Sequence, residues 1–327
     1  MVQPKSRTGL GRIVESVLIA LTLAALVGCA STSLTQVKQF GSASKALGEY
    51  ARSAFDLAAT ASVDRHLYDV AADPNKGPTD ATFEGLFTGD GGVPGGKEKA
   101  ERLALRLRVL DQLSNYSSAL QQLAEADFDK DIDEAAKDLN GALIGLRDTF
   151  KEASGSDLPL TDDDVGIIAT AVNAIGKAVA EAKRRTAIKT TITKADPAVQ
   201  SATELIASDL GQDSELASFV KQAISNSRGS LQQVYNLERV RSKSTFDSRY
   251  SLLVRARELY GAEVNTPAFF AAVSRGAAAV GKAHSALRKA VEADDFSSDE
   301  VAKRLGELEV YVKSVRGFYD SIRKTAN

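Results

Sequence analysis

The sequence is poor in the residues that commonly crosslink a protein or equip it for catalysis. Its 327 residues include one cysteine, one methionine, two histidines and no tryptophan. A single cysteine excludes a disulfide within the chain and any metal site built from several thiolates. The folded chain must therefore be stabilised by the packing of its side chains.

The N-terminus combines positive charge with a short apolar run. Lys5, Arg7 and Arg12 precede an apolar stretch from Val17 to Val27. This stretch is too short to span a bilayer comfortably as a helix. A positive leader before a short apolar core predicts a cleavable export signal.

The signal ends in Leu26-Val27-Gly28-Cys29, which contains the only cysteine. These four residues resemble the lipobox of bacterial lipoproteins, in which cleavage precedes a cysteine whose thiol accepts a diacylglyceryl group. The resemblance implies cleavage between Gly28 and Cys29, with a diacylglyceryl group and an N-acyl chain on Cys29 as the only attached groups. Two or more chains hold a protein stably on a membrane, at about 0.8 kcal/mol per buried CH₂. An uncleaved anchor helix with an incidental cysteine is the alternative.

Ala30 and Ser31 follow the cysteine. In the lipoprotein class an aspartate after the cysteine often marks retention in the inner membrane, so its lack here implies the outer membrane of a two-membrane bacterium. We therefore expect a protein of the bacterial cell envelope that is lipid-anchored in the outer membrane and faces the periplasm. Exposure on the cell exterior is the alternative.

The chain divides into a signal peptide, residues 1–28, and a mature region, residues 29–327. The mature region has 299 residues, enough for one large domain or two small ones. It contains 38 basic and 42 acidic residues, which gives a net charge of about −4. This charge argues against nucleic acid as a partner.

Apolar residues recur at alternating spacings of three and four along most of the mature region, without the two-residue alternation of strands. This heptad pattern is typical of helices that pack along a seam. We expect an all-α fold, an elongated bundle of about six or seven long antiparallel helices with coiled-coil-like seams and no sheet. Gly41 and Gly48 flank the first seam and predict close approach of a neighbouring helix. The clearest seam positions are Phe40, Leu47, Leu103, Leu107, Leu110, Leu113, Tyr116, Leu120, Leu123, Leu139, Leu143, Leu146, Val273, Val280, His284 and Leu287.

Proline and capping residues predict where helices begin and end. Asp73-Pro74 ends the first helix and opens a Gly/Pro-rich loop, residues 73–96. Thr161 followed by three aspartates predicts a helix start, because acids favour the positive end of the helix dipole. Asp196-Pro197 and Thr266-Pro267 each predict a new helix, since proline favours the position after the cap.

The region between these two starts has a weaker pattern. We expect the helix that opens at Pro197 to bend at Gly211 and then to resume its apolar face. From Arg239 to Arg249 the apolar stripe nearly vanishes, which predicts an exposed helix or an overhang. Whether residues 197–262 form one helix stays open. Ser297 with Glu300 forms a capping box and predicts the start of the last helix.

Two stretches match binding loops in spacing alone. Residues 91–97 have the glycine and lysine spacing of a phosphate-binding loop, but no strand precedes them and Glu98 replaces the hydroxyl residue. Asp127, Asp129 and Asp131 alternate as in a calcium loop, whose glycine and final glutamate are missing here. A flexible linker and an acidic helix start explain the two stretches more simply. We expect no cofactor and no metal, with the three aspartates as weak metal candidates.

His66 and His284 are the only histidines, and His284 falls on the inward face of its helix. A metal or catalytic pair would require the two to meet beside carboxylates such as Asp64 or Asp69. A packed histidine and a surface histidine are the simpler interpretation. We therefore expect no catalytic residue.

Charge is unevenly distributed along the chain. Residues 177–194 carry six cations and one acid, residues 228–257 carry seven cations and two acids, and residues 125–138 carry seven acids and two cations. Neutralisation across the bundle is the default interpretation. The alternative is that the basic faces contact anionic headgroups, lipopolysaccharide phosphates or an acidic partner.

These features predict a lipid-anchored envelope lipoprotein that is not an enzyme. We expect it to act as a structural, scaffold or adaptor component, with a protein partner in the envelope that contacts its helical surface. Two alternatives stay open. One is an accessory lipoprotein of a secretion or transport complex. The other is an enzyme or ligand carrier with an interhelical pocket near His284 or a carboxylate cluster.

Overall fold

The computed structural model describes residues 34–53, 55–56, 65, 67–73, 75, 93–126, 129–173, 181–241, 243–294 and 298–325. The lipobox residues Leu26 to Cys29, the histidine His66 and most of the loop at 73–96 lie outside this set. Within it the chain is all-α, with antiparallel helices and no strand, as the heptad pattern predicts.

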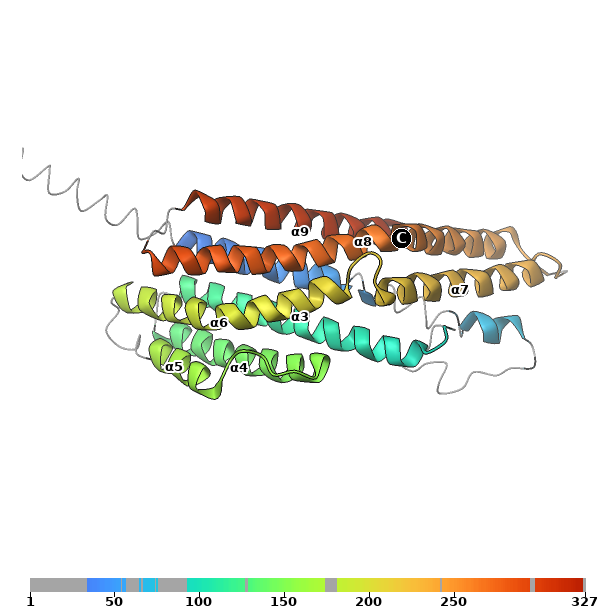
Figure 1. Cartoon of the computed structure of the whole chain (residues 1–327). Helices are drawn as coiled ribbons and strands as arrows, with labels where there is room; N and C mark the ends of the chain where they lie inside the picture. The colour runs from blue at the N-terminus through green and yellow to red at the C-terminus, as the bar shows by residue number, and fades with distance from the viewer. Residues whose placement is uncertain are drawn as a thin grey trace, which may run out of the picture.

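The helices form an elongated bundle (Figure 1). An N-terminal helical segment, residues 34–53 and 55–56, comes first, and residues 67–72 are also helical. The later helices are α3 (Gly96–Glu125), α4 (Asp129–Ser154), α5 (Asp162–Asn173), α6 (Glu181–Asp209), α7 (Glu215–Glu238), α8 (Phe246–Glu292) and α9 (Asp299–Thr325).

Helix α8 is the long axis of the bundle. It has 47 residues, which corresponds to about 70 Å at 1.5 Å per residue. Helices α6 and α7 lie end to end along it, and α9 packs along another side (Figure 1). On the far side of α6, helix α3 pairs with α4, and α5 packs against α4 and α6.

The N-terminal helical segment runs antiparallel to α8. Its Phe40 ring lies 5.5 Å from the ring of His284, whereas its Phe55 ring lies 5.1 Å from the ring of Phe270. Residue numbers therefore rise along the segment as they fall along α8. The described chain begins near the Glu292 end of α8, opposite the connection between α7 and α8.

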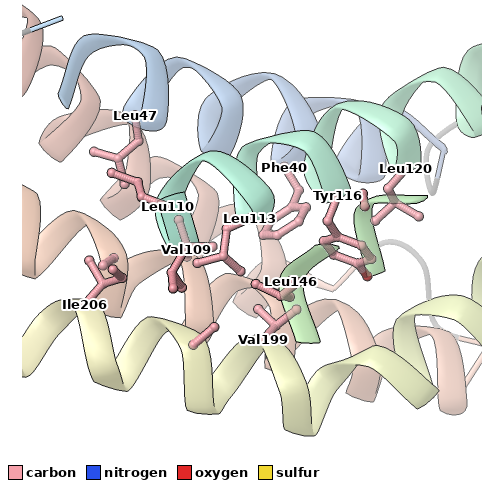
Figure 2. Close-up of a cluster of buried hydrophobic side chains, with 14 of the residues drawn as sticks. Phe40, Leu47, Val109, Leu110, Leu113, Tyr116, Leu120, Leu146, Val199 and Ile206 are labelled. Carbon is pink, nitrogen blue, oxygen red and sulfur yellow. The ribbon is translucent and has the colours of Figure 1, made fainter. Parts of the chain in front are cut away.

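The core forms where the N-terminal helical segment, α3, α4 and α6 meet (Figure 2). All seven predicted inward positions of α3 are buried, which confirms the heptad assignment. Full burial of a leucine side chain stabilises a fold by about 1.5–3 kcal/mol relative to exposure. The buried seam positions of α3 are Leu103, Leu107, Leu110, Leu113, Tyr116, Leu120 and Leu123.

Glycines let the N-terminal helical segment approach α3 closely, as predicted. A Cβ atom on Gly41 would lie 2.6 Å from the backbone oxygen of Ser117. A Cβ atom on Gly48 would lie 1.8 Å from the hydroxyl oxygen of Ser114. Neither distance is possible for nonbonded atoms, so a larger residue at either position would force the helices apart.

The two proline-based helix starts are wrong. Asp196-Pro197 lies inside α6, and Thr266-Pro267 lies inside α8. Both expected caps bond elsewhere: the Asp196 carboxylate accepts from His284, and the Thr266 hydroxyl donates to the backbone oxygen of Ala262 at 2.8 Å. The second bond is typical of a residue within a helix. Packing of α6 along α8 therefore outweighs the cost of an interior proline, about 3 kcal/mol in an isolated helix.

The region from 197 to 262 is not one helix. Helix α6 ends at Asp209, and Ser214 caps α7 by accepting from the backbone N–H of Ala217 at 3.0 Å. The expected bend at Gly211 is therefore a break between two helices. The stretch from Arg239 to Arg249, expected to be an exposed helix or an overhang, is divided. Residues 239–245 form the connection between α7 and α8, and residues 246–249 are the first turn of α8 after its cap Thr245.

Other predicted boundaries hold. Residues 67–72, directly before Asp73, are helical. Thr161 caps α5, since its hydroxyl oxygen accepts from the backbone N–H of Asp164 at 3.1 Å. Helix α9 begins at Asp299, close to the predicted start, and the expected cap Ser297 lies outside the described residues.

Candidate functional site

A buried polar network surrounds His284, which α8 directs into the core. Its side chain has no exposed surface. The Nε2 atom lies 2.8 Å from the hydroxyl oxygen of Tyr116 on α3, and the Nδ1 atom lies 2.8 Å from Oδ1 of Asp196 on α6. One imidazole therefore joins three helices.

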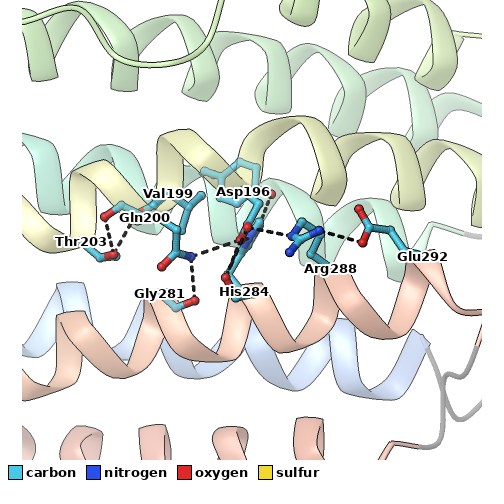
Figure 3. Close-up of polar contacts among 10 residues, drawn as sticks. Asp196, Val199, Gln200, Thr203, Gly281, His284, Arg288 and Glu292 are labelled. Carbon is cyan, nitrogen blue, oxygen red and sulfur yellow. Dashed lines mark hydrogen bonds and ion pairs between the residues drawn. The ribbon is translucent and has the colours of Figure 1, made fainter.

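Asp196 is the centre of the network (Figure 3). Besides His284, its carboxylate accepts from Gln200 at 3.1 Å, from the Ser285 hydroxyl at 3.2 Å, and from Nε of Arg288 at 2.9 Å. Arg288 also donates to Glu292 at 2.7 Å. The network thus leads from a buried imidazole to charged groups at the surface.

The protonation states follow from this geometry. Burial acts to raise the pKa of Asp196, but the hydrogen bonds from His284, Gln200 and Ser285 outweigh burial and hold the pKa below its ordinary value. Burial, together with the nearby Asp196 carboxylate, raises the pKa of Tyr116. Asp196 is therefore an acceptor and Tyr116 keeps its proton. These partners assign the tautomer of His284 that donates from Nδ1 and accepts at Nε2.

The network is better suited to hold helices than to catalyse a reaction. A carboxylate that orients a histidine is a common arrangement for a general base. Here, however, the Tyr116 hydroxyl occupies Nε2, and neither Tyr116 nor His284 has exposed surface. A substrate could reach the imidazole only if α3, α6 and α8 separated. A satisfied buried network instead specifies which turns of these helices lie side by side.

Two of the three weak metal candidates lie within the described residues. Asp129 and Asp131 both belong to α4, and residues two apart on a helix do not face one another. Asp131 is exposed, and Asp127 lies outside the described residues. Within the described part of the chain, no group of three histidine, cysteine, aspartate or glutamate side chains is arranged to hold a metal ion.

The glycine-rich stretch before α3 begins a helix. Gly95 is the N-cap of α3 and has a φ of 65°, a left-handed conformation that favours glycine. Lys97 is an exposed residue of the first turn. The preceding Gly91 and Gly92 lie outside the described residues.

Two cations of the first basic run form ion pairs. Lys189 pairs with Asp294 at 3.1 Å, and Lys194 pairs with Asp164 at 3.0 Å. Both pairs join α6 to another part of the bundle, as the default interpretation expects for these two residues.

Two surface grooves of about 480 Å³ each lie away from His284. One lies between α3 and α4 and is polar, with Gln112, Asn115, Gln122, Lys137 and Asp138 in its lining. The other lies between α7 and α8 and combines apolar, aromatic and arginine side chains.

Sequence reasoning identified His284 and Tyr116 as inward residues but missed their connection to Asp196. The missed signal is the spacing along α6: Asp196 lies four residues after Ile192 and three before Val199, both of which are buried. A carboxylate on an apolar seam requires a buried partner. The assumed helix start at Pro197 concealed this pattern.

The fold and this network define an all-α antiparallel bundle with a polar core network. No family model matches the chain, and comparisons with curated proteins and with solved structures also found no match. Among the described helices, none has the length and apolar character needed to cross a bilayer.

Proposed function

We propose that this protein is a lipid-anchored bacterial envelope lipoprotein that acts as a non-enzymatic scaffold or adaptor through its helical surface. The observation that carries the proposal is Leu26-Val27-Gly28-Cys29, placed after a positive leader and a short apolar run. Cys29 would carry the diacylglyceryl and N-acyl chains. The outer membrane, on its periplasmic side, is the proposed location.

The arrangement of the bundle supports an adaptor role. The first described helical residue, Leu34, follows Cys29 by five residues, so the chain between them spans at most about 17 Å. The N-terminal helical segment begins toward the Glu292 end of α8, because Phe40 contacts His284 and Phe55 contacts Phe270, and the connection to α7 lies at the other end of α8. An anchor at Cys29 would hold one end of the bundle near the membrane and leave the distal end, about 70 Å away, available for contacts.

The buried state of His284 supports the non-enzymatic part of the proposal. Both of its ring nitrogens are bonded within the protein, and its side chain has no exposed surface. Neither of the two grooves described above is lined by His284.

The anchor is tested by the covalent state of Cys29. Wild-type protein extracted from membranes is expected to begin at Cys29 and to carry fatty-acyl label. The variant Cys29→Ser should lose the label and accumulate as uncleaved precursor, whereas the matched variant Ser31→Ala should behave as the wild type. Intact mass spectrometry measures both cleavage and acylation. A Cys29→Ser protein that still carries fatty-acyl label, or a wild-type protein that retains residues 1–28, contradicts the proposal.

The adaptor role is tested by crosslinking in living cells. A photoreactive amino acid replaces exposed residues at the distal end, such as Tyr250, and at the lateral surface of α9, such as Val310. Reproducible crosslinks to one envelope protein from the distal position support the proposal. The absence of any protein crosslink from either position contradicts it.

A further inference from the structure

The first half of α8 carries an apolar stripe on the outside of the bundle. The α8 stripe consists of Phe246, Tyr250, Leu253, Arg257, Tyr260 and Val264. Its spacings alternate between four and three, and its five uncharged members are 49–70% exposed. The same heptad spacing buries residues elsewhere in this bundle, so the stripe is a helix-packing surface that the described residues leave uncovered.

The stripe lies where the bundle is thinnest. Phe318 of α9 stacks on Phe269 of α8 with ring centroids 4.4 Å apart, and α9 ends seven residues later at Thr325. The earlier turns of α8 therefore extend beyond α9 and pair with α7 (Figure 1). The helical residues 67–72 also contact α8 here, since Nε of Arg255 donates to the Tyr68 hydroxyl at 3.4 Å. These contacts leave the α8 stripe exposed.

The α7–α8 groove, about 480 Å³ in volume, borders the stripe directly. Leu253, Arg257 and Tyr260 belong to both the stripe and the groove lining. Helix α7 supplies the facing wall through Leu231, Gln232, Tyr235 and Asn236. The stripe covers residues 246–264 and extends about 27 Å along α8, which matches a helix of about 20 residues. The concave shape and heptad spacing fit a third helix laid between the first two.

The charge of this surface is positive. Residues 228–264 contain seven cations and four acids. Arg228 pairs with Glu263 at 2.9 Å, Arg255 with Glu258 at 2.8 Å, and Arg241 with Glu238 at 3.5 Å. Within the part of the chain that the structure describes, no ion pair includes the exposed cations Arg239, Lys243 or Arg257.

We propose that the α7–α8 groove and the α8 stripe dock an acidic amphipathic helix of a partner protein. This inference deepens the adaptor function proposed above and rests on it. The partner's apolar seam covers the α8 stripe, and its acidic flanks pair with Arg239, Lys243 and Arg257. Tyrosine and arginine, which this surface presents together, are the residues that most often dominate binding energy at protein interfaces.

The charge distribution selects this occupant over a second copy of the chain. Two copies would bring Arg257 and its neighbouring cations together, and like charges across an interface oppose association. A flat membrane surface would reach the exposed stripe but not the groove lining between the helices. An acidic helix satisfies both the shape and the charge.

The test uses the full lipidated protein in detergent and a labelled synthetic helix. The probe is a fluorescein-labelled 21-residue peptide with leucine at the seam positions and glutamate at the flanks, and its matched partner has lysine at the flanks. Fluorescence anisotropy should show micromolar binding of the glutamate peptide, at least tenfold weaker in 0.5 M salt. The lysine peptide should bind at least tenfold more weakly than the glutamate peptide.

Variants locate the binding surface. Leu253→Asp should weaken binding of the glutamate peptide at least tenfold, and Arg257→Glu should do the same while improving binding of the lysine peptide. Val310→Ala, at an exposed apolar residue of α9, should change nothing. Each variant is included only if its helicity and melting temperature equal those of the wild type.

Three results would overturn the inference. The first is equal binding of the glutamate and lysine peptides to the wild type, or binding of the glutamate peptide to Leu253→Asp and Arg257→Glu that is as strong as its binding to the wild type. The second is sedimentation as a dimer that Leu253→Asp converts to a monomer, which assigns the surface to a second copy. The third is binding to phosphatidylglycerol vesicles that Leu253→Asp abolishes, which assigns it to a membrane. None of these results alters the state of Cys29, so failure here is distinguishable from failure of the anchor proposal.

Discussion

His284 donates from Nδ1 to Oδ1 of Asp196 across 2.8 Å, and this bond joins α8 to α6 inside the core. The same carboxylate accepts from Arg288 on the next turn of α8. Two donors one turn apart on α8 thus share a single acceptor on α6. This sharing fixes the position of α6 along α8 at the turn where Pro197 interrupts the hydrogen bonding of α6.

Replacement of the shared acceptor should strongly destabilise the fold. Asp196→Ala leaves the buried Nδ1 donor of His284 without its partner, and an unsatisfied buried donor costs about 1–3 kcal/mol. Urea unfolding followed by circular dichroism measures the loss. The matched variant Asp213→Ala, in the exposed connection between α6 and α7, should change stability by less than about 0.5 kcal/mol.

The hydroxyl of Tyr116 should contribute separately from its ring. Tyr116→Phe keeps the buried ring but leaves Nε2 of His284 without a donor. An unsatisfied buried acceptor costs about 1–3 kcal/mol. Tyr250→Phe is the control, because Tyr250 is exposed on the α8 stripe. Equal stability of the Tyr116→Phe variant and the wild type would show that the bond does not stabilise the core.

Acid should weaken the protein partly through Asp196. Because the pKa of Asp196 is lower in the folded than in the unfolded chain, the unfolded state binds more protons at low pH. The contribution of ionised Asp196 to the stability of the fold is complete above its pKa in the unfolded chain, about 3.9, and is lost as the pH falls through its pKa in the folded chain. Urea unfolding between pH 6 and pH 2 should therefore show a smaller decrease for Asp196→Asn than for the wild type. A parallel decrease would contradict the assignment.

The heptad pattern was sufficient to predict the fold class because burial alone determines it. Leu107, Leu120 and Leu143 lie inward as expected, since apolar spacing does not depend on where a helix ends. Helix boundaries could not be predicted in the same way, because the capping bonds of a side chain compete with the bonds that it can form to other helices in the folded protein. Asp196 and Thr266 both had the chemistry of caps, yet each bonds as an interior residue.

The candidate site was only half predictable for a related reason. The inward position of His284 followed from its own helix, but its partners lie 168 and 88 residues away in sequence. Tyr116 and Asp196 could be matched to it only once α3, α6 and α8 were known to meet. The α8 stripe was missed because the apolar pattern was expected to nearly vanish from Arg239 to Arg249 and a new helix was expected at Thr266-Pro267, whereas α8 is continuous from Phe246.

Two glycine substitutions should have opposite effects on stability. In Gly48→Ala the new Cβ would lie 1.8 Å from the hydroxyl oxygen of buried Ser114, so the Ser114 side chain must leave its present position or the N-terminal helical segment must move away from α3. Such overpacking costs about 1–3 kcal/mol. In Gly229→Ala, within α7, the new Cβ meets no atom within 4 Å, and removal of glycine from a helix interior should stabilise the protein by about 0.5–1 kcal/mol.

The second substitution Ser114→Gly tests the cause of the Gly48 effect. It removes the side chain that the new Cβ would meet, so Gly48→Ala should cost much less in the Ser114→Gly background than alone. Thermal and urea unfolding of the four proteins in this cycle measure the coupling. Only direct contact between the two positions lets Ser114→Gly reduce the stability cost of Gly48→Ala. Additive changes in the free energy of unfolding would therefore show that the N-terminal helical segment and α3 are not in tight contact at this turn.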